Sequence, residues 1–229
     1  MQALRSEVAG LKGEVLSMKE SMDFMNIKFE EMKTEAKDKF EICTQLQKEV
    51  ETLKNDNLEL VNRLNEFEQH SRACNIEIQC VPEHRSENLI TTILQLAKTV
   101  SCDIKAEDIH HCTRTAKLDG NSSRPRNIVA KLKSPHMRDT LLASVIKFNK
   151  TDKDNKLNSS HLGLGGDKKP VYVAEHLTAY NKKLHKEARL AAKDKQYKYV
   201  WVRSGRILVR KDDKAQAIVL KSLDSIKRL

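Results

Sequence analysis

The residues best suited to chemistry lie near the C-terminus, where aromatic and basic side chains alternate. Residues 197–203 alternate in character, residues 206–211 form a second run, and Ser204-Gly205 separates the two, which predicts a β-hairpin. Its candidate binding residues are Tyr199, Trp201, Arg203, Arg206 and Arg210. On a strand surface, aromatic rings stack on the bases of single-stranded nucleic acid and cations follow its phosphates. Trp201 fits a hydrophobic core equally well.

A second group of cations shares one face of a helix that the sequence predicts between Thr178 and about Lys195. Lys182, Lys186 and Arg189 are spaced four and three residues apart, and Lys183 lies alongside. Side chains at this spacing lie on the same side of a helix. We expect this row to bind phosphate.

A third group consists of Arg114, Arg124 and Arg126 in the middle of the chain. We expect nucleic acid to lie in a basic groove between two folded domains, with these arginines on one side. The other side of the groove is expected to consist of Lys182, Lys183, Lys186, Tyr199, Arg203 and Arg206. A polar loop over residues 149–170 would let the two domains close on the strand.

Catalytic, metal and cofactor sites are not predicted. Cys74, Cys80 and Cys112 form no Cys-x-x-Cys pair of the kind that binds zinc. Residues 163–166 lack the Gly-Lys-Ser/Thr ending of a phosphate-binding loop. No spacing suggests a catalytic triad or a carboxylate pair, so we expect a binding protein without enzymatic activity.

The elements that carry these residues predict an α+β fold with three parts. Residues 71–175 read as a small βαββαβ domain, with strands at 75–81, 109–118, 128–132 and 171–174 and helices at 87–100 and 135–148. That order is typical of the RNA-recognition-motif fold. Its two central strands contain no aromatic residue, so we expect binding through charge there. Residues 176–229 read as a small α/β domain.

Residues 1–70 predict a long parallel coiled coil. Apolar residues alternate at spacings of four and three over about nine heptads, with Leu4 at d and Val8 at a, and residues 36–39 interrupt the seam. This segment has 10 Lys+Arg against 15 Asp+Glu, a net charge of −5, which leaves +15 for the remainder of a chain whose total is +10. Such an asymmetry predicts separate partners for the two parts, with a polyanion for the second. The apolar seam of the first part, which a lone helix would leave uncovered, predicts self-association.

The number of strands in the coil is open between two and three. Val at a, Leu at d and Asn57 at a favour a dimer. The motif formed by Arg63, Leu64, Phe67 and Glu68 resembles one known from parallel trimeric coiled coils. We expect the homotrimer over the dimer.

Several segments resemble known families. Glu68-Gln-His-Ser-Arg72-Ala-Cys-Asn75-Ile-Glu-Ile-Gln-Cys-Val81-Pro82-Glu83, after a coiled coil, resembles the first open-reading-frame protein of LINE retrotransposons. Residues 172–178 and 199–212 resemble the C-terminal domain of baculovirus few-polyhedra (FP) proteins. The resemblance implies a homotrimer that coats single-stranded RNA and acts as a nucleic-acid chaperone, encoded by a retroelement or a virus-like gene. Residues that match positions implicated in binding in the family are Arg114, Arg124, Arg126, Lys182, Lys183 and Tyr199.

Composition limits the remaining possibilities. No apolar run reaches the roughly 20 residues of a membrane span, and five Cys without a secretion signal indicate a reducing compartment. We therefore expect a cytoplasmic location, with the nucleus as a second one, no membrane association, and DNA as a second candidate ligand. The alternative to RNA binding is a structural protein that recruits partners through its coil and an acidic protein through its basic domains.

Overall fold

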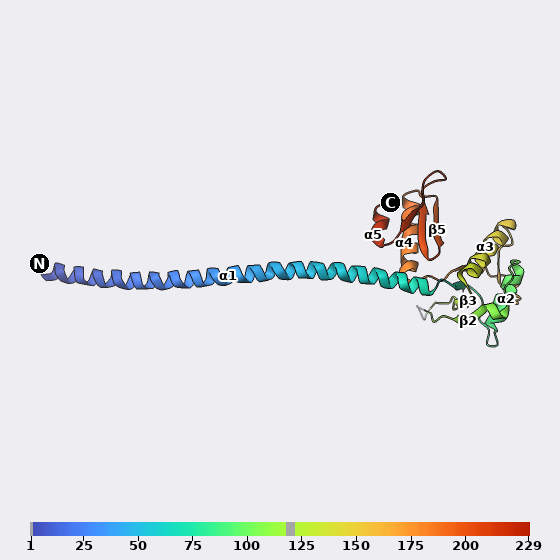
Figure 1. Ribbon diagram of the computed structural model, residues 1–229, viewed down its shortest axis with the longest axis horizontal. Helices are drawn as coiled ribbons and strands as arrows, with labels where there is room; N and C mark the ends of the chain where they lie inside the picture. Colours follow the sequence, from blue (N-terminus) through green and yellow to red (C-terminus); the bar gives the residue numbers. More distant parts are fainter. Residues whose placement is uncertain (1, 118–121) are drawn as a thin grey trace. The chain divides into compact units, whose positions relative to one another are not determined.

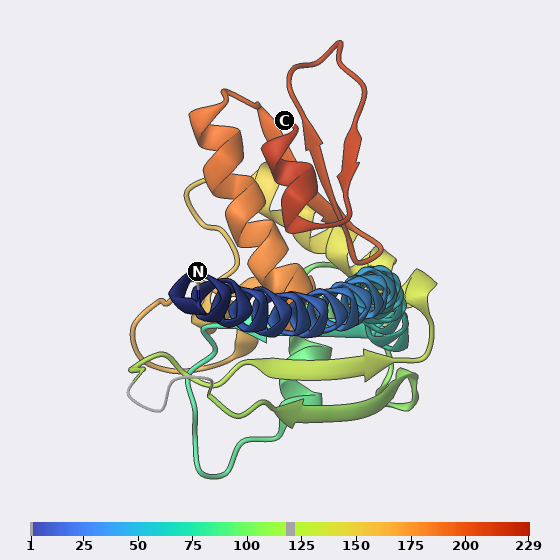
Figure 2. The ribbon, with the colours of Figure 1, turned by 90° about the vertical axis from the view of Figure 1, so that its left-hand side faces the viewer.

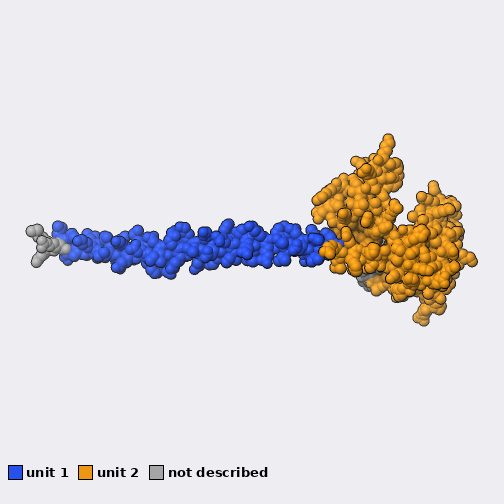
Figure 3. All heavy atoms as spheres, in the orientation of Figure 1, with its two compact units in different colours: residues 1–62 blue, residues 63–229 orange. Residues whose placement is uncertain are grey.

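The protein, seen here as a computed structural model, is described over residues 2–117 and 122–229. Its helices and antiparallel sheets confirm the mixed α+β class (Figure 1). The chain divides into two compact units, Met1–Asn62 and Arg63–Leu229 (Figure 3).

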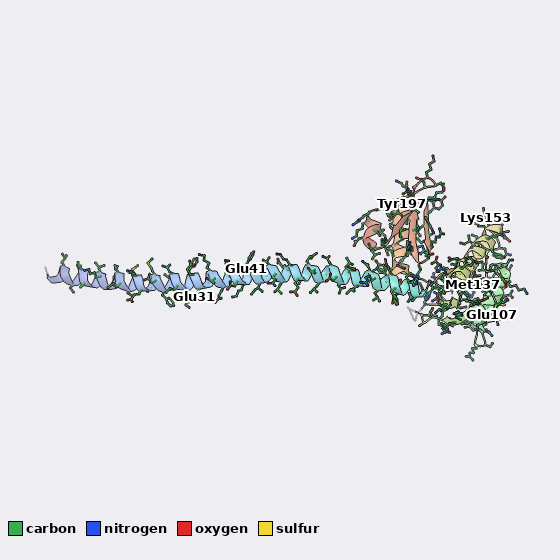
Figure 4. All side chains as sticks on the ribbon, viewed as in Figure 1. Glu31, Glu41, Glu107, Met137, Lys153 and Tyr197 are labelled. Carbon is green, nitrogen blue, oxygen red and sulfur yellow. The ribbon has the colours of Figure 1, made fainter. Side chains whose placement is uncertain are left out.

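The first element is one uninterrupted helix, α1, from Gln2 to Ser71. The break in the apolar seam at residues 36–39 does not interrupt the helix, because no Pro or Gly lies there. Side chains project from α1 along its length (Figure 4). Leu64 is 62 % and Phe67 is 73 % exposed in the single chain. Asn57 is exposed too, and assembly of this helix into a coiled coil stays a prediction.

A four-stranded antiparallel sheet follows, with strand order β2-β3-β1-β4. Its strands are β1 (Asn75–Gln79), β2 (Ile109–Arg114), β3 (Ile128–Leu132) and β4 (Tyr172–Glu175). The helices are α2 (Leu89–Thr99) and α3 (Pro135–Thr151), with short 3-10 turns at Ala106–Asp108 and Ser159–Leu162. Ile76 and Ile78 pack in one core with Leu96 of α2 and Leu141 of α3, because alternate residues of a strand face the same side.

The helices and strands expected in this domain are present, but some begin or end at other residues than the sequence predicted. The side chains of Asn88 and Ser134 cap α2 and α3, and Pro135 occupies the first turn of α3 as its sequence predicts. The second strand, expected to reach Leu118, ends at Arg114, and Leu118 lies outside the described residues. Cys80 has a left-handed backbone (φ 66°), so it ends the first strand and does not continue its alternation.

The long loop expected at residues 149–170 begins after Thr151 and contains the short 3-10 turn Ser159–Leu162, but it is packed on the domain. Helix α3 continues to Thr151, and Leu157 and Leu162 are buried in the core of this domain. The amide of Leu157 donates a hydrogen bond to Asn149 Oδ1 at 2.8 Å. Two leucines therefore anchor this segment to the domain, although its overall composition is polar.

The last part of the chain packs two helices on a three-stranded sheet of order β5-β6-β7 (Figure 2). Its elements are α4 (Ala179–Asp194), β5 (Tyr199–Arg203), β6 (Arg206–Arg210), β7 (Ile218–Leu220) and α5 (Leu223–Lys227). Thr178 caps α4, and the predicted hairpin turn has left-handed residues at Ser204 and Gly205, as a tight two-residue turn requires. Ile207 and Val209 form the core with Leu184 of α4.

Candidate nucleic-acid interface

The strand register gathers the aromatic and basic residues of the hairpin on one face. Val200 pairs with Val209 and Val202 with Ile207, and this set faces α4. The alternate pairs are Tyr199 with Arg210, Trp201 with Leu208, and Arg203 with Arg206. Successive strand residues point to opposite faces, so these six side chains share the face away from α4. We call this the open hairpin face.

Tyr199 has specific neighbours on the open hairpin face. The guanidinium carbon of Arg210 lies 4.6 Å from the centroid of its ring, and Lys198 Nζ lies 5.1 Å from it. The Tyr199 hydroxyl donates a hydrogen bond to Asp213. Two cations therefore lie beside the ring, and both also lie within ion-pair distance of Asp213.

Trp201 is half-buried and lies on the open hairpin face, on the side of the sheet opposite the core that contains Leu184. Of the two alternatives that its sequence context allowed, the structure favours the surface position. Leu208 and Val219 lie in register beside it, and sequence reasoning missed both. Residues 206–210 read Arg-Ile-Leu-Val-Arg, and the position of Leu208 between Ile207 and Val209 was the signal that could have placed it on the opposite face.

The cations of α4 face away from the hairpin. Leu184, Ala188 and Ala192 are the buried side of this helix, whereas Lys186 and Arg189 are exposed, as are Lys183 and Lys193. The row of cations is thus on the outer side of α4, and the open hairpin face is on the far side of the sheet. The expectation that Lys186 and Tyr199 line one side of one groove is therefore wrong, because the apolar side of α4 that packs on the hairpin lies opposite its basic row.

Lys182, in the same row, has a carboxylate partner on the four-stranded sheet. Its Nζ lies 2.8 Å from Glu77, which is 2 % exposed. Asn127 Nδ2 donates a second hydrogen bond to Glu77, at 2.6 Å. Glu77 occupies the face of β1 opposite Ile76 and Ile78. A buried acid in the middle of this sheet face disfavours phosphate there, and the absence of aromatic residues in β1 and β3 leaves no ring in the central strands on which a base could stack.

Arg114 is buried, and its guanidinium donates hydrogen bonds to other groups of the protein. Its side chain is 4 % exposed and makes two bonds of 2.6 Å to the carboxylate of Glu87. It also donates to the carbonyl oxygens of Val81, Pro82 and Arg126 at 3.1, 2.9 and 2.6 Å. The hydrogen bond from Arg114 is the main cause that lowers the pKa of Glu87. Arg114 therefore holds loops together and is not available to a phosphate.

Arg126 and Arg124 lie in the loop before β3 and differ in their partners. The Arg126 guanidinium lies 2.8 Å from Glu83, and its backbone amide donates to the same carboxylate at 2.6 Å. These hydrogen bonds lower the pKa of Glu83 to about 2. Arg124 is exposed, so of these two arginines it is the one more available to bind a phosphate.

Tyr172 is an aromatic residue that sequence reasoning missed on the four-stranded sheet. It pairs with Gln79 at the edge strand β4 and is 58 % exposed. Its position lies outside the two central strands, which is why a search for aromatics in those strands did not find it.

Other chemistry is limited in the described part of the chain. No group of three or more His, Cys, Asp or Glu residues there is arranged to hold a metal ion. Burial raises the pKa of the Cys112 thiol to about 11, which makes it a poor nucleophile. No helix among residues 2–117 and 122–229 is both long and apolar enough to cross a membrane.

Comparison with known families agrees with the C-terminal geometry. Residues 178–229 match the family model of baculovirus FP protein domain 2. The match begins at the cap of α4 and covers the basic row and the hairpin, so the expected similarity of this domain is confirmed. A comparison with curated proteins gave no match. No homologue supports the resemblance to LINE proteins, which stays a prediction.

Proposed function

We propose that this protein binds single-stranded RNA as a parallel homotrimer, coats it and acts as a nucleic-acid chaperone without enzymatic activity. The observation that carries the proposal is the open hairpin face, where Tyr199 and Trp201 lie among three arginines. Stacking on aromatic rings tolerates any base, and cations beside them hold phosphates. A net charge of +15 outside residues 1–70 agrees with a polyanionic partner.

Helix α4, the loop that contains Arg124 and the four-stranded sheet would each contribute differently to RNA binding. Exposed cations of α4 would hold phosphates of a second stretch of RNA, and Arg124 would add a further contact. The order of strands in the four-stranded sheet supports an RNA-recognition-motif-like domain, but its buried Glu77 suggests that RNA avoids the centre of that sheet.

Assembly through α1 would multiply these contacts. Three copies joined by a parallel coil present three open hairpin faces, and linked sites bind one strand more tightly than separate ones. Many weak and individually reversible contacts also suit a chaperone, because strands can exchange while the coat stays bound. The match to an FP domain is consistent with a virus-like or retroelement gene.

Filter binding to single-stranded RNA across a salt series tests the proposal. We expect affinity to fall steeply with salt, with a log–log slope of roughly −0.7 for each phosphate contact. Single-stranded DNA of the same sequence serves as the comparison ligand. No binding at low salt would leave the alternative, in which the basic domains bind an acidic protein.

A further inference from the structure

Gln69, near the end of α1, is bonded to the segment that starts the C-terminal part of the chain. Its Oε1 accepts hydrogen bonds from the Thr178 amide and from Asn181 Nδ2, both at 3.0 Å. Its Nε2 donates to the carbonyl oxygen of His176 at 3.1 Å. Two donors on one side and a carbonyl on the other fix the orientation of the Gln69 amide.

The hairpin turn packs against the same side chain. Gly205 has φ +74°, and a Cβ added there would lie 2.4 Å from Cγ of Gln69. Asn181 Nδ2 also donates to the Gly205 carbonyl at 3.1 Å. A side chain at position 205 would therefore displace Gln69.

The carboxylate of Glu175 also binds the hairpin turn. Glu175 accepts hydrogen bonds from the amides of Ser204 and Gly205, at 2.9 and 2.6 Å. The start of α4 and the β5–β6 turn are thus held at one point. The basic row runs along α4 from this point, and the open hairpin face extends along the strands from the turn.

We infer that Gln69 is a positioning residue for nucleic-acid binding, although its side chain belongs to neither binding surface. It fixes α4 and the hairpin to the last turns of α1, so that both surfaces are held in place before RNA arrives. Holding a binding surface in its bound arrangement lowers the cost of association. The inference rests on the proposed function, since it concerns how the same surfaces bind RNA.

The test uses the full chain and four variants: Gln69→Ala, Gly205→Ala, their double variant, and Gly163→Ala. Gly163 is the matched control because it has the same φ of +74° with nothing within 4 Å of an added Cβ. Each variant is measured for RNA affinity over a salt series, for mass by sedimentation equilibrium, and for hydrogen exchange at the amides of Thr178 and Gly205.

We expect Gln69→Ala to weaken RNA binding about tenfold, equivalent to about 1.4 kcal/mol, with unchanged mass and salt slope. Gly205→Ala should weaken binding more than Gly163→Ala. The double variant should bind more weakly than Gln69→Ala by no more than Gly163→Ala binds more weakly than the parent, because the added methyl then has space and only the strain of the positive φ remains. Exchange at the Thr178 and Gly205 amides should rise in the Gln69 variants. A lost salt slope would instead indicate a lost phosphate contact and would contradict a positioning role.

Failure of this inference differs from failure of the proposed function. If the parent binds RNA, and Gln69→Ala and Gly205→Ala bind it as well as the parent does, Gln69 has no positioning role and RNA binding stands. If the parent does not bind RNA at low salt, the proposed function is wrong and the inference falls with it, whatever the exchange measurements show.

Discussion

Tyr199 is the residue at which stacking can be tested most directly. Tyr199→Ala should cost about 1–3 kcal/mol of RNA-binding free energy if a base stacks on the ring, without a change in salt slope. Tyr199→Phe removes only the hydroxyl that donates to Asp213, so it should bind like the parent.

Tyr172→Ala is the matched control, since it removes an exposed aromatic from the other sheet. Filter binding measures all three variants. Equal losses for Tyr172→Ala and Tyr199→Ala would show that the open hairpin face is not a special stacking surface.

Arg114 shows how burial changes the role of a basic residue. Arg114→Met should lower the free energy of unfolding by about 3–5 kcal/mol, because Glu87 would lose its partner in a largely buried ion pair. Arg124→Met, on the exposed loop, should change it by less than about 0.5 kcal/mol. Urea unfolding followed by circular dichroism measures both, and equal stability of the two variants would contradict the structural role.

The ion pair of Glu83 predicts how the stability of the fold changes with pH. Its pKa is lowered from 4.5 to about 2, chiefly by the hydrogen bond from Arg126. A lowered pKa in the folded state means that the carboxylate stabilises the fold above pH 4.5 and loses this effect as the pH falls through about 2. The difference in urea midpoint between the parent and Glu83→Gln should therefore shrink over that interval. Glu107→Gln, an exposed change in the same domain, is the control, and a constant difference for Glu83→Gln would count against the pair.

At the scale of elements, the exposed row of α4 predicts a change in salt dependence. Lys186→Ala with Arg189→Ala should reduce the steepness of the log–log slope by about 1.4 if both residues contact phosphate. Alanine favours helices, so α4 should stay folded. Lys168→Ala with Lys169→Ala removes the same charge from an exposed segment and should leave the slope nearly unchanged. The same reduction in both pairs would mean that only net charge matters.

At the scale of the whole molecule, Cys43 can report on the direction of the predicted coil. In the heptad register that starts with Leu4 at d, Cys43 is an a residue, and a residues of parallel in-register helices meet across the seam. In a fully overlapping antiparallel pair Cys43 would face about residue 30, so about 13 residues at 1.5 Å each would separate the thiols by roughly 20 Å.

Mild oxidation should therefore produce a covalent dimer on a non-reducing gel, and Cys43→Ser should abolish it. A trimer with one such cysteine per chain links two of its three copies at most, so sedimentation equilibrium is needed to count the chains. Absence of the Cys43-dependent band in oxidised protein would refute the parallel in-register arrangement.

The sequence by itself determined the elements whose signals are local. Heptad spacing defined α1, the capping residues Ser134 and Thr178 defined the starts of α3 and α4, and Ser204-Gly205 defined the hairpin turn. Each of these signals lies within a few residues of the feature it specifies. Alternation also placed Tyr199 and Arg203 on one strand face, which the register confirms.

Only the tertiary structure decided which cations are available. Arg114 and Arg124 look alike in the sequence, yet Glu87, 27 residues from Arg114, buries one in an ion pair and leaves the other exposed. Lys182 meets Glu77 across 105 residues, and Gln69 meets Thr178 across 109. The packing of α4 on the hairpin also separated Lys186 from Tyr199. The free energy of a charge depends on its partners and on its burial, and folding brings those partners from distant parts of the chain.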